Sequence, residues 1–434
     1  MFANKKISTA YLTNLSFCFF PISLIIGSPI VNLNLLVFLI LSFFHIKKNN
    51  YKFKINYANL TLTCFFLFVI LSTIINIKSL NYEYALKSVF LLRFLLLYII
   101  VEILLINKCL DLKKFFTACL LCTAFVSLDI IYQFIFGYDI FGYPQHDGQI
   151  AGPFYSEGVG GSYIQRFSLF SIFGSLFFFR ENYKKYFLFV VILLISLAIF
   201  IATNRMSVLL IIFSIFLLIL FYKKNRLTVV LSFTTFLLGV VLLFNYNEEI
   251  NARYVTFYEK IIKEKGIQYG KEDATTGEWK AELEVNAKTT INLYSHNRIY
   301  YTVIESWKND PIIGGGYKSF RVKCKDVLHK KKNIICSTHP HNYHLEVLHD
   351  FGIIGFILIS IFVFLKIYDA FKFHFSSSRN QNYDLYFIPI TIIFFSEIWP
   401  LKSTGMLFTT WNGTIVWLIV SLTAIYELNK NKKN

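Results

Sequence analysis

Long apolar runs separated by short polar segments make up most of the chain. A helix rises about 1.5 Å per residue, so a run of about 17 to 20 apolar residues can cross the hydrocarbon core of a membrane. A transmembrane strand would instead alternate apolar and polar residues, whereas these runs are continuous. We therefore predict an all-α membrane protein with about twelve transmembrane helices, near residues 12–28, 30–46, 59–76, 85–106, 114–136, 164–179, 186–203, 206–222, 226–244, 343–368, 384–400 and 408–428.

The apolar runs fall into two unequal groups on either side of one long polar segment, and no internal repeat relates the two groups. The polar segment is expected to be partly helical, around 247–265 and around 297–309, with Asn297 placed to cap the second helix. Residues 1–244 are predicted to form a nine-helix bundle with an outer loop at 137–163. Residues 245–342 would form one large loop, and residues 343–434 three closing helices with a short tail.

The composition supports a membrane protein, because 55% of the residues are hydrophobic and the mean hydropathy is +0.53. A net charge of +17 would also suit a nucleic-acid partner. However, Lys and Arg are concentrated in short connections on one side of the predicted bundle, such as Lys47 with Lys48 and Lys223 with Lys224. Such residues mark the cytoplasmic side. We therefore expect cytoplasmic N- and C-termini, an external large loop and no nucleic-acid partner.

Two of the seven cysteines, Cys324 and Cys336, share the large loop, whereas the others lie in or beside predicted spans. An oxidising compartment would allow these two to form a disulfide. The bond would close a loop of about 13 residues and stabilise the fold by roughly 3 kcal/mol. Two cysteines in one loop can also remain free, so the sequence leaves this pairing open.

Two arginines stand where an anion could bind outside the membrane. Arg205 lies in the short turn TNRMS between two predicted spans, and Arg298 follows Asn297 at the predicted start of the external helix. A helix N-terminus attracts anions, and a guanidinium binds phosphate oxygens in pairs. Both arginines are therefore candidates for binding a diphosphate, and a lipid head group is the alternative partner for Arg205.

Histidines gather at the outer entrance of the tenth predicted span, in the stretch HPHNYHLEVLHD. His339 and His341 precede the span, and Asn342 is placed to cap its helix. A hydrated histidine titrates near neutral pH and suits a general base. Three imidazoles in an HxHxxH pattern could also bind a metal, but no HExxH or CxxC spacing accompanies them. We therefore favour a base over a metal ligand.

Three further charged residues near the predicted outer mouth require partners. Arg93, in the fourth predicted span, is expected to contact another helix and is a candidate to line a path for a lipid phosphate, because a charge within a membrane is usually functional or paired. Glu157 and Arg166 flank the start of the sixth predicted span. We expect these two to pair across the outer mouth, as a structural rather than a catalytic contact.

Several of these segments together resemble the bacterial O-antigen ligase and polymerase superfamily. His341-Asn342 followed by Gly352 resembles the ligase pattern of His, a small polar residue, nine others and Gly. The stretch NRIYYTVIESWKNDPIIGGGYKSF resembles the Arg-led helix and Pro-x-x-Gly-x-Gly turn of the family, and TNRMSVLL resembles its short outer turn. GPFYSEGVGGSYIQR and WPLKSTGMLFTTWN are also similar to family segments. One departure is Asn297, where Gly is more usual.

The resemblance implies a metal-independent, inverting glycosyltransferase without a cofactor, in the inner membrane of a Gram-negative bacterium. Its donor would be an undecaprenyl-diphosphate-linked glycan and its acceptor lipid A-core, with membrane lipids around it. Arg205 and Arg298 would bind the diphosphate, and His341 would be the base at the periplasmic face, with His339 as a second participant. The residues expected to support them are Asn342, Gly352, Glu157 and Arg93.

Other reactions remain open at this point. A ligase that transfers the finished polysaccharide to lipid A-core is favoured by the His-Asn…Gly pattern and the size of the loop. An O-antigen polymerase that joins repeat units on the same carrier is the main alternative. A protein-acceptor oligosaccharyltransferase usually carries a longer C-terminal region. A transporter of lipid-linked sugars would be expected to show repeated halves.

Overall fold

The computed structural model describes most of the chain. Every regular element among the described residues is a helix, apart from one isolated bridge between Tyr138 and Pro144. The predicted all-α class is therefore confirmed. The described residues are 8–53, 55–145, 150–155, 157–248, 250–255, 293–328, 335–375 and 384–428, with the backbone alone for 293–297.

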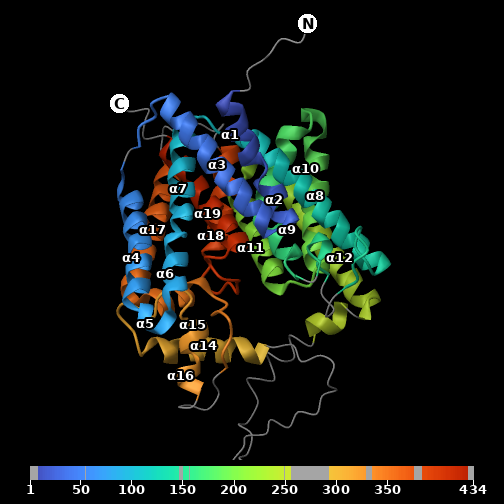
Figure 1. Ribbon diagram of the computed structural model, residues 1–434. Helices are drawn as coiled ribbons and strands as arrows, with labels where there is room; N and C mark the ends of the chain where they lie inside the picture. Colours follow the sequence, from blue (N-terminus) through green and yellow to red (C-terminus); the bar gives the residue numbers. More distant parts are fainter. Residues whose placement is uncertain are drawn as a thin grey trace, which may run out of the picture.

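Most of the helices run roughly along one axis and form an elongated bundle (Figure 1). Those before the large loop are α1 Thr9–Cys18, α2 Phe20–Ile26, α3 Ser28–Lys48, α4 Tyr57–Ile75, α5 Ile77–Leu80, α6 Tyr82–Val89, α7 Leu92–Ile106, α8 Leu112–Phe136, α9 Gly160–Phe178, α10 Lys184–Ile201, α11 Arg205–Phe221 and α12 Arg226–Tyr246. The later ones are α14 Leu293–Trp307, α15 Phe320–Lys323, α16 Lys325–Leu328, α17 Tyr343–His374, α18 Asp384–Glu397 and α19 Thr410–Leu422, and the short 3-10 helices are η1 Gly152–Phe154, η2 Glu181–Tyr183, η3 Lys223–Asn225 and η5 Thr423–Glu427.

The number of membrane spans differs from the prediction. Among the described residues, seven helices are long and apolar enough to cross a membrane, with α6 and α7 counted together, or eight if the bent pair α1 and α2 is one span. Twelve spans are therefore not confirmed, although each of the twelve predicted runs is helical. Four runs account for most of the difference: α11, α18 and α19 have 17, 14 and 13 residues, and α9 carries Gln165 and Arg166.

The helix α9 shows why a short or polar helix fits inside this bundle. Almost all of its side chains are buried, and it packs against α8, α10, α11 and α18. A Cβ atom at Gly174 would lie 2.4 Å from the carbonyl oxygen of Phe116 on α8, so the two backbones touch. Protein rather than lipid therefore surrounds α9, and its polar groups find partners within the bundle.

The first predicted span is broken into two helices. α1 and α2 meet at an angle of 48° around Phe19. Pro21 lies in the first turn of α2, where its ring and its missing N–H prevent one continuous helix. Gly27, with φ +129°, then separates α2 from α3.

Three helices of the large loop, α14, α15 and α16, lie across one end of the bundle (Figure 1). On α14, Ile299 and Val303 face Phe320 and Cys324, and these four side chains form a small separate core. A disulfide joins Cys324 to Cys336, with a Cα–Cα distance of 5.7 Å, which answers the question that the sequence left open. The parts of the predicted loop at 256–292 and 329–334, and the tail from 429, lie outside the described residues.

The start of α14 corrects one expectation. The helix begins at Leu293, before the predicted cap at Asn297. Arg298 therefore lies within the helix rather than in its first turn, where the backbone N–H groups would be free. The reasoning from the helix dipole for an anion at Arg298 is thus wrong, and any anion bound there must be held by side chains.

The long helix α17 is interrupted at Gly352, whose backbone is not helical (φ 61°, ψ −167°). The loop that follows α14 fills this break. The N–H groups of Gly315 and Gly316 donate to the carbonyls of His349 and Asp350, at 3.1 and 2.7 Å. On the other side of the break, the N–H groups of Ile353 and Ile354 donate to the carbonyls of residues 311 and 312. The loop therefore replaces the hydrogen bonds that α17 loses, which satisfies buried backbone groups.

Helix α4 holds the same loop from its other side. Ser72 Oγ donates to the carbonyl of Ile313 at 2.8 Å, and Asn76 Nδ2 donates to the carbonyl of Gly314 at 3.0 Å. The N–H of Tyr317 donates to Thr73 Oγ1 at 3.0 Å. The glycine-rich loop is thus held between α4 and α17 and connects α14 and α15 to the bundle.

Candidate functional site

The predicted base, His341, lies in a loop that the structure fixes firmly. Its backbone is in the left-handed region (φ 57°), which is uncommon for a residue with a side chain. Its carbonyl accepts a hydrogen bond from the N–H of Thr404 at 2.9 Å. Its Nε2 lies 3.4 Å from Ser337 Oγ, and its ring centroid lies 3.9 Å from that of His339. The structure therefore brings His339 and His341 together at the start of α17.

The role of Asn342 as a helix cap is confirmed. Its side-chain oxygen accepts a hydrogen bond from the N–H of Leu345 at 3.1 Å. Its Nδ2 donates to the carbonyl of Pro400 at 2.8 Å, so Asn342 also ties α17 to the loop before α19. A cap that uses both ends of its amide sets the direction in which the chain enters α17.

Arg298 lies on α14, and another residue of this helix contacts the loop before α19. Two residues further along, the hydroxyl of Tyr300 forms a hydrogen bond with Ser403, the neighbour of Thr404. Burial raises the pKa of Tyr300, and the bond to Ser403 partly opposes this shift. The loop 399–404 therefore contacts both α14 and the segment that carries His341.

Arg205 is held by another part of the chain. It is the first residue of α11, where Asn204 caps the helix by accepting a bond from the N–H of Ser207 at 3.2 Å. The Nη2 of Arg205 donates to the carbonyl of Arg253 at 3.1 Å, in the segment after α12. Arg205 therefore lies at the start of α11 and contacts the segment after α12. Arg298 lies on α14, and His341 lies just before α17.

A buried group of charges replaces the predicted pair of Glu157 and Arg166. Arg166 pairs with Glu397 of α18 at 3.2 Å, and Lys402 Nζ lies 2.8 Å from the other oxygen of Glu397. All three side chains are at most 5% exposed, whereas Glu157 is exposed. The predicted pairing was wrong because α18 enters the bundle beside α9 and supplies a buried carboxylate.

Two neutral residues complete this charged group. Arg166 Nη2 donates to the hydroxyl of Tyr343 at 2.9 Å, and Asn412 Nδ2 donates to the same hydroxyl at 2.8 Å. Burial lowers the pKa of Lys402 to about 8, although the carboxylate of Glu397 opposes this shift. Because Tyr343 directly follows the cap residue Asn342, the charged group supports the entrance to α17. Glu397 and Lys402 were not predicted as site residues, although both are charged residues at the end of an apolar run.

The remaining histidines of the cluster have structural contacts. His349 is buried, with Nε2 at 2.9 Å from Ser306 Oγ of α14 and Nδ1 at 3.0 Å from Asp350 Oδ1. Ser319 Oγ donates to the same oxygen of Asp350 at 2.8 Å. His344 Nε2 lies 3.2 Å from the carbonyl of Ile398. His349 therefore joins α14 to α17, and neither histidine lies beside His341 in the way that His339 does.

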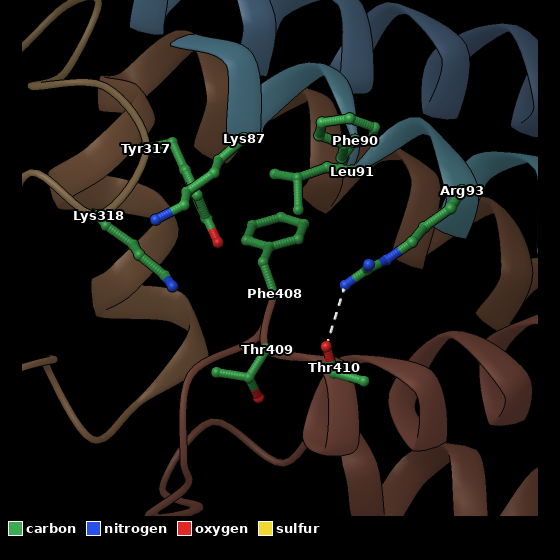
Figure 2. A pocket seen from close by; sticks show the side chains of 9 residues that line it. All are labelled: Lys87, Phe90, Leu91, Arg93, Tyr317, Lys318, Phe408, Thr409 and Thr410. Carbon is green, nitrogen blue, oxygen red and sulfur yellow. Dashed lines mark hydrogen bonds between the residues drawn. The ribbon is translucent and has the colours of Figure 1, made fainter. Parts of the chain in front are cut away.

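Arg93 lines a cavity of about 310 Å³ beside Tyr317 and Lys318, which follow the glycine-rich loop (Figure 2). Its Nη2 donates to Thr410 Oγ1 at 3.4 Å and its Nη1 to Asn32 Oδ1 at 3.3 Å. Two more cations, Lys87 and Lys318, line the cavity. The other lining residues are Phe90, Leu91, Tyr317, Phe408, Thr409 and Thr410. Within the described part of the chain, no three His, Cys, Asp or Glu side chains are grouped as a metal site would require.

Part of the chain matches the sequence model of a known protein family. Residues 189–360 match the family described as O-antigen ligase. This stretch contains Arg205, Arg298, His341 and Gly352, and it ends inside α17. No curated protein matches the chain.

Proposed function

Because the match over residues 189–360 supports the O-antigen ligase and polymerase superfamily, we propose that this chain is the ligase of that superfamily. The match supports a membrane glycosyltransferase of the ligase or polymerase type in lipopolysaccharide biosynthesis. The finer proposal is that it transfers O-antigen polysaccharide from undecaprenyl diphosphate to a sugar hydroxyl of lipid A-core. The reaction would take place at the periplasmic face of the inner membrane, with both termini in the cytoplasm.

The position of His341 carries the proposal. Its carbonyl is bound by Thr404, and the next residue, Asn342, caps α17 while bonding to the loop before α19. A general base is effective when it is held in a fixed position next to the group that loses the proton. The hydrogen bonds around His341 give this side chain such a frame at the outer end of the bundle.

The transfer would proceed in one inverting step. The acceptor hydroxyl oxygen attacks the anomeric carbon on the face opposite the diphosphate, and the bond from that carbon to the diphosphate oxygen breaks. His341 takes the proton from the attacking hydroxyl, with His339 beside it. The diphosphate leaves with the bonding electrons, and Arg205 and Arg298 stabilise its negative charge by hydrogen bonds to the phosphate oxygens.

Arg205 and Arg298 supply in this proposal the positive charge that a divalent metal supplies in many other transferases. The two arginines come from different sides of the fold, since one starts α11 and the other lies within α14. A diphosphate has two phosphate groups that can each accept a bidentate arginine. We therefore propose that the donor head group binds between these two helices, without metal or other cofactor.

A reaction with purified protein tests the proposal. The wild type is incubated in detergent with an undecaprenyl-diphosphate-linked glycan and lipid A-core, and products are separated on a gel. We expect glycan on lipid A-core and free undecaprenyl diphosphate, and we expect neither with His341→Ala. The matched control is His374→Ala, at the other end of α17.

The same reaction separates the ligase from the main alternative. Longer glycans on the carrier lipid when no lipid A-core is added would support an O-antigen polymerase and would contradict the ligase. Transfer by His341→Ala at the wild-type rate would remove this residue from the mechanism.

A further inference from the structure

The cavity beside Arg93 has positively charged walls from three separate elements. Lys87 comes from α6, Arg93 from α7, and Lys318 from the turn after the glycine-rich loop. In Figure 2, Lys87 and Lys318 reach in from one side and Arg93 from the other, with Phe408 between them. Among the residues that the structure describes, no Asp or Glu lines the cavity.

The backbone of Lys318 is held in place by neighbouring residues. Its backbone is in the left-handed region (φ 59°), and its N–H donates to Asp350 Oδ2 of α17 at 2.8 Å. Its Nζ lies 5.1 Å from the ring centroid of Tyr317. An unusual backbone conformation held by surrounding contacts is often found at a ligand site. The same clamp that closes the break in α17 therefore directs this lysine into the cavity.

Arg93 has weak partners for a partly buried guanidinium. Its hydrogen bonds, at 3.3 and 3.4 Å, go to the neutral side chains of Asn32 and Thr410. Its Nε is buried and has no hydrogen-bond partner in the described structure. Arginines in such positions normally bind a carboxylate or a phosphate, which form shorter and stronger bonds. The cavity therefore contains donors that an anion would satisfy.

The nearby acids neutralise the cavity only in part. Glu83 pairs with Lys87 at the surface and offsets the charge of that lysine. Asp350 is buried and accepts bonds from Ser319 and from the backbone of Lys318, and Glu346 accepts one from the N–H of Leu407.

The surroundings of Lys318 lower its pKa, with burial as the largest cause. Burial lowers that pKa, and the positive charges of Arg321 and Lys87 lower it further, while Glu346 and Asp350 oppose the shift only in part. The cations around the cavity thus repel one another more than the nearby acids compensate. A bound anion would relieve this repulsion.

The cavity is placed to receive its ligand from the membrane. Lys87, Phe90 and Arg93 lie in the candidate membrane span Tyr82–Ile106. Phe90 is 62% exposed on the perimeter of the bundle while it also lines the cavity. Leu91 and Phe408 add apolar surface inside. If the anion carries an acyl chain, the acyl chain would lie against Phe90 and the surrounding lipid.

We propose that this cavity binds the phosphate group of a membrane-lipid head group, at a site distinct from Arg205 and Arg298. Arg93 would bind two phosphate oxygens, and Lys87 and Lys318 would add charge. The hydroxyls of Thr409 and Thr410 would donate to the remaining oxygens. A volume of about 310 Å³ accommodates a head group. The proposal requires no transferase activity, so it can fail or hold independently of the proposed reaction.

Binding to purified protein in detergent tests this inference. The probes are a short-chain phosphatidate, a phosphatidylcholine of the same chain length, and inorganic phosphate, measured by calorimetry. We expect the phosphatidate to bind wild type at least about tenfold more tightly than either other probe. Arg93→Gln and Lys318→Gln should each weaken it by about tenfold, because each removes a charged hydrogen bond. Lys318→Arg, which keeps the charge, should bind nearly as wild type.

Lys78→Gln is the matched control, since Lys78 is an exposed lysine on α5 outside the cavity. The affinity of Lys78→Gln for phosphatidate should equal that of wild type. Gel filtration and a melting curve check that each variant is folded. Equal binding of inorganic phosphate would overturn the lipid assignment. Unchanged binding in folded Arg93→Gln and Lys318→Gln, or no binding of phosphatidate to wild type, would overturn the site itself.

Discussion

Gly352 of α17 lies against Gly314 of the glycine-rich loop so closely that neither position has room for a side chain. A Cβ atom at Gly314 would lie 2.3 Å from the backbone nitrogen of Gly352, and one at Gly352 would lie 2.3 Å from the carbonyl oxygen of Ile312. Both glycines have positive φ, +79° and +61°. The spacing from His341 to Gly352 thus places the break in α17 where the glycine-rich loop binds.

This contact predicts a large effect for a single methyl group. Gly352→Ala should destabilise the protein by about 2–4 kcal/mol, through backbone strain and the clash with Ile312. The midpoint of thermal unfolding in detergent measures the change. Gly405→Ala is the control, because its Cβ would approach nothing closer than 3.9 Å. Equal midpoints for both variants would contradict the tight contact.

Glu397 holds two buried cations, so its neutralisation should be costly. Glu397→Gln would leave Arg166 and Lys402 without a counter-charge in the interior. We expect a loss of about 3–5 kcal/mol in the free energy of unfolding. Glu181→Gln, which removes an exposed pair with Lys184, should change little. Comparable stability of the two variants would show that the buried group contributes no more than a surface pair.

The same group predicts how stability depends on pH. The folded protein releases the proton of Lys402 at a pKa of about 8, whereas the ordinary value is 10.5. Between these two values the unfolded chain binds more protons, so this group makes the folded state more stable as pH rises. The midpoint of thermal unfolding should therefore rise less between pH 7.5 and 10 in Lys402→Met than in wild type. An equal rise of the midpoint in both proteins would show that Lys402 keeps an ordinary pKa.

The two arginines of the proposed diphosphate site should act through their geometry as well as their charge. Arg298→Ala and Arg205→Ala should each lower the transfer rate by about 10²–10³-fold, because each removes donors to the leaving group. Arg298→Lys should recover only part of the loss, since lysine cannot bind two oxygens. Initial rates with the purified protein measure this, with Arg226→Ala as control, because Arg226 is an exposed arginine at the start of α12 that bonds to the far end of α11. Wild-type rates in Arg298→Ala would exclude that role.

Local sequence signals predicted the local features of the site. Asn342 before an apolar run identified a helix cap, and the family pattern identified Gly352. Neither signal indicates which distant segments meet. Glu397 pairs with Arg166, which is far from it in the chain, and also with Lys402. The sequence instead favours Glu157 as the partner of Arg166, because Glu157 is the nearer acid along the chain. Long-range pairing follows from helix packing, which apolar periodicity alone does not specify.

The number of spans shows a similar limit. Apolar length predicted a helix at each of the twelve runs, and helices are found there. Length does not tell whether lipid or protein surrounds a helix. α18 and α19 are short and mostly buried, because neighbouring helices enclose them. The start of α14 was also misjudged, since Asn297 has a capping side chain but lies inside the helix.

The most direct test of the central claim is a lipopolysaccharide gel from the native host with this gene deleted. We expect the deletion strain to show lipid A-core without polymer, while polymer accumulates on the carrier lipid. Wild type should restore the polymer ladder, and His341→Ala, inserted in the membrane at the same level, should not. A ladder that persists in the deletion strain, or that His341→Ala restores, would contradict the proposed ligase and its base.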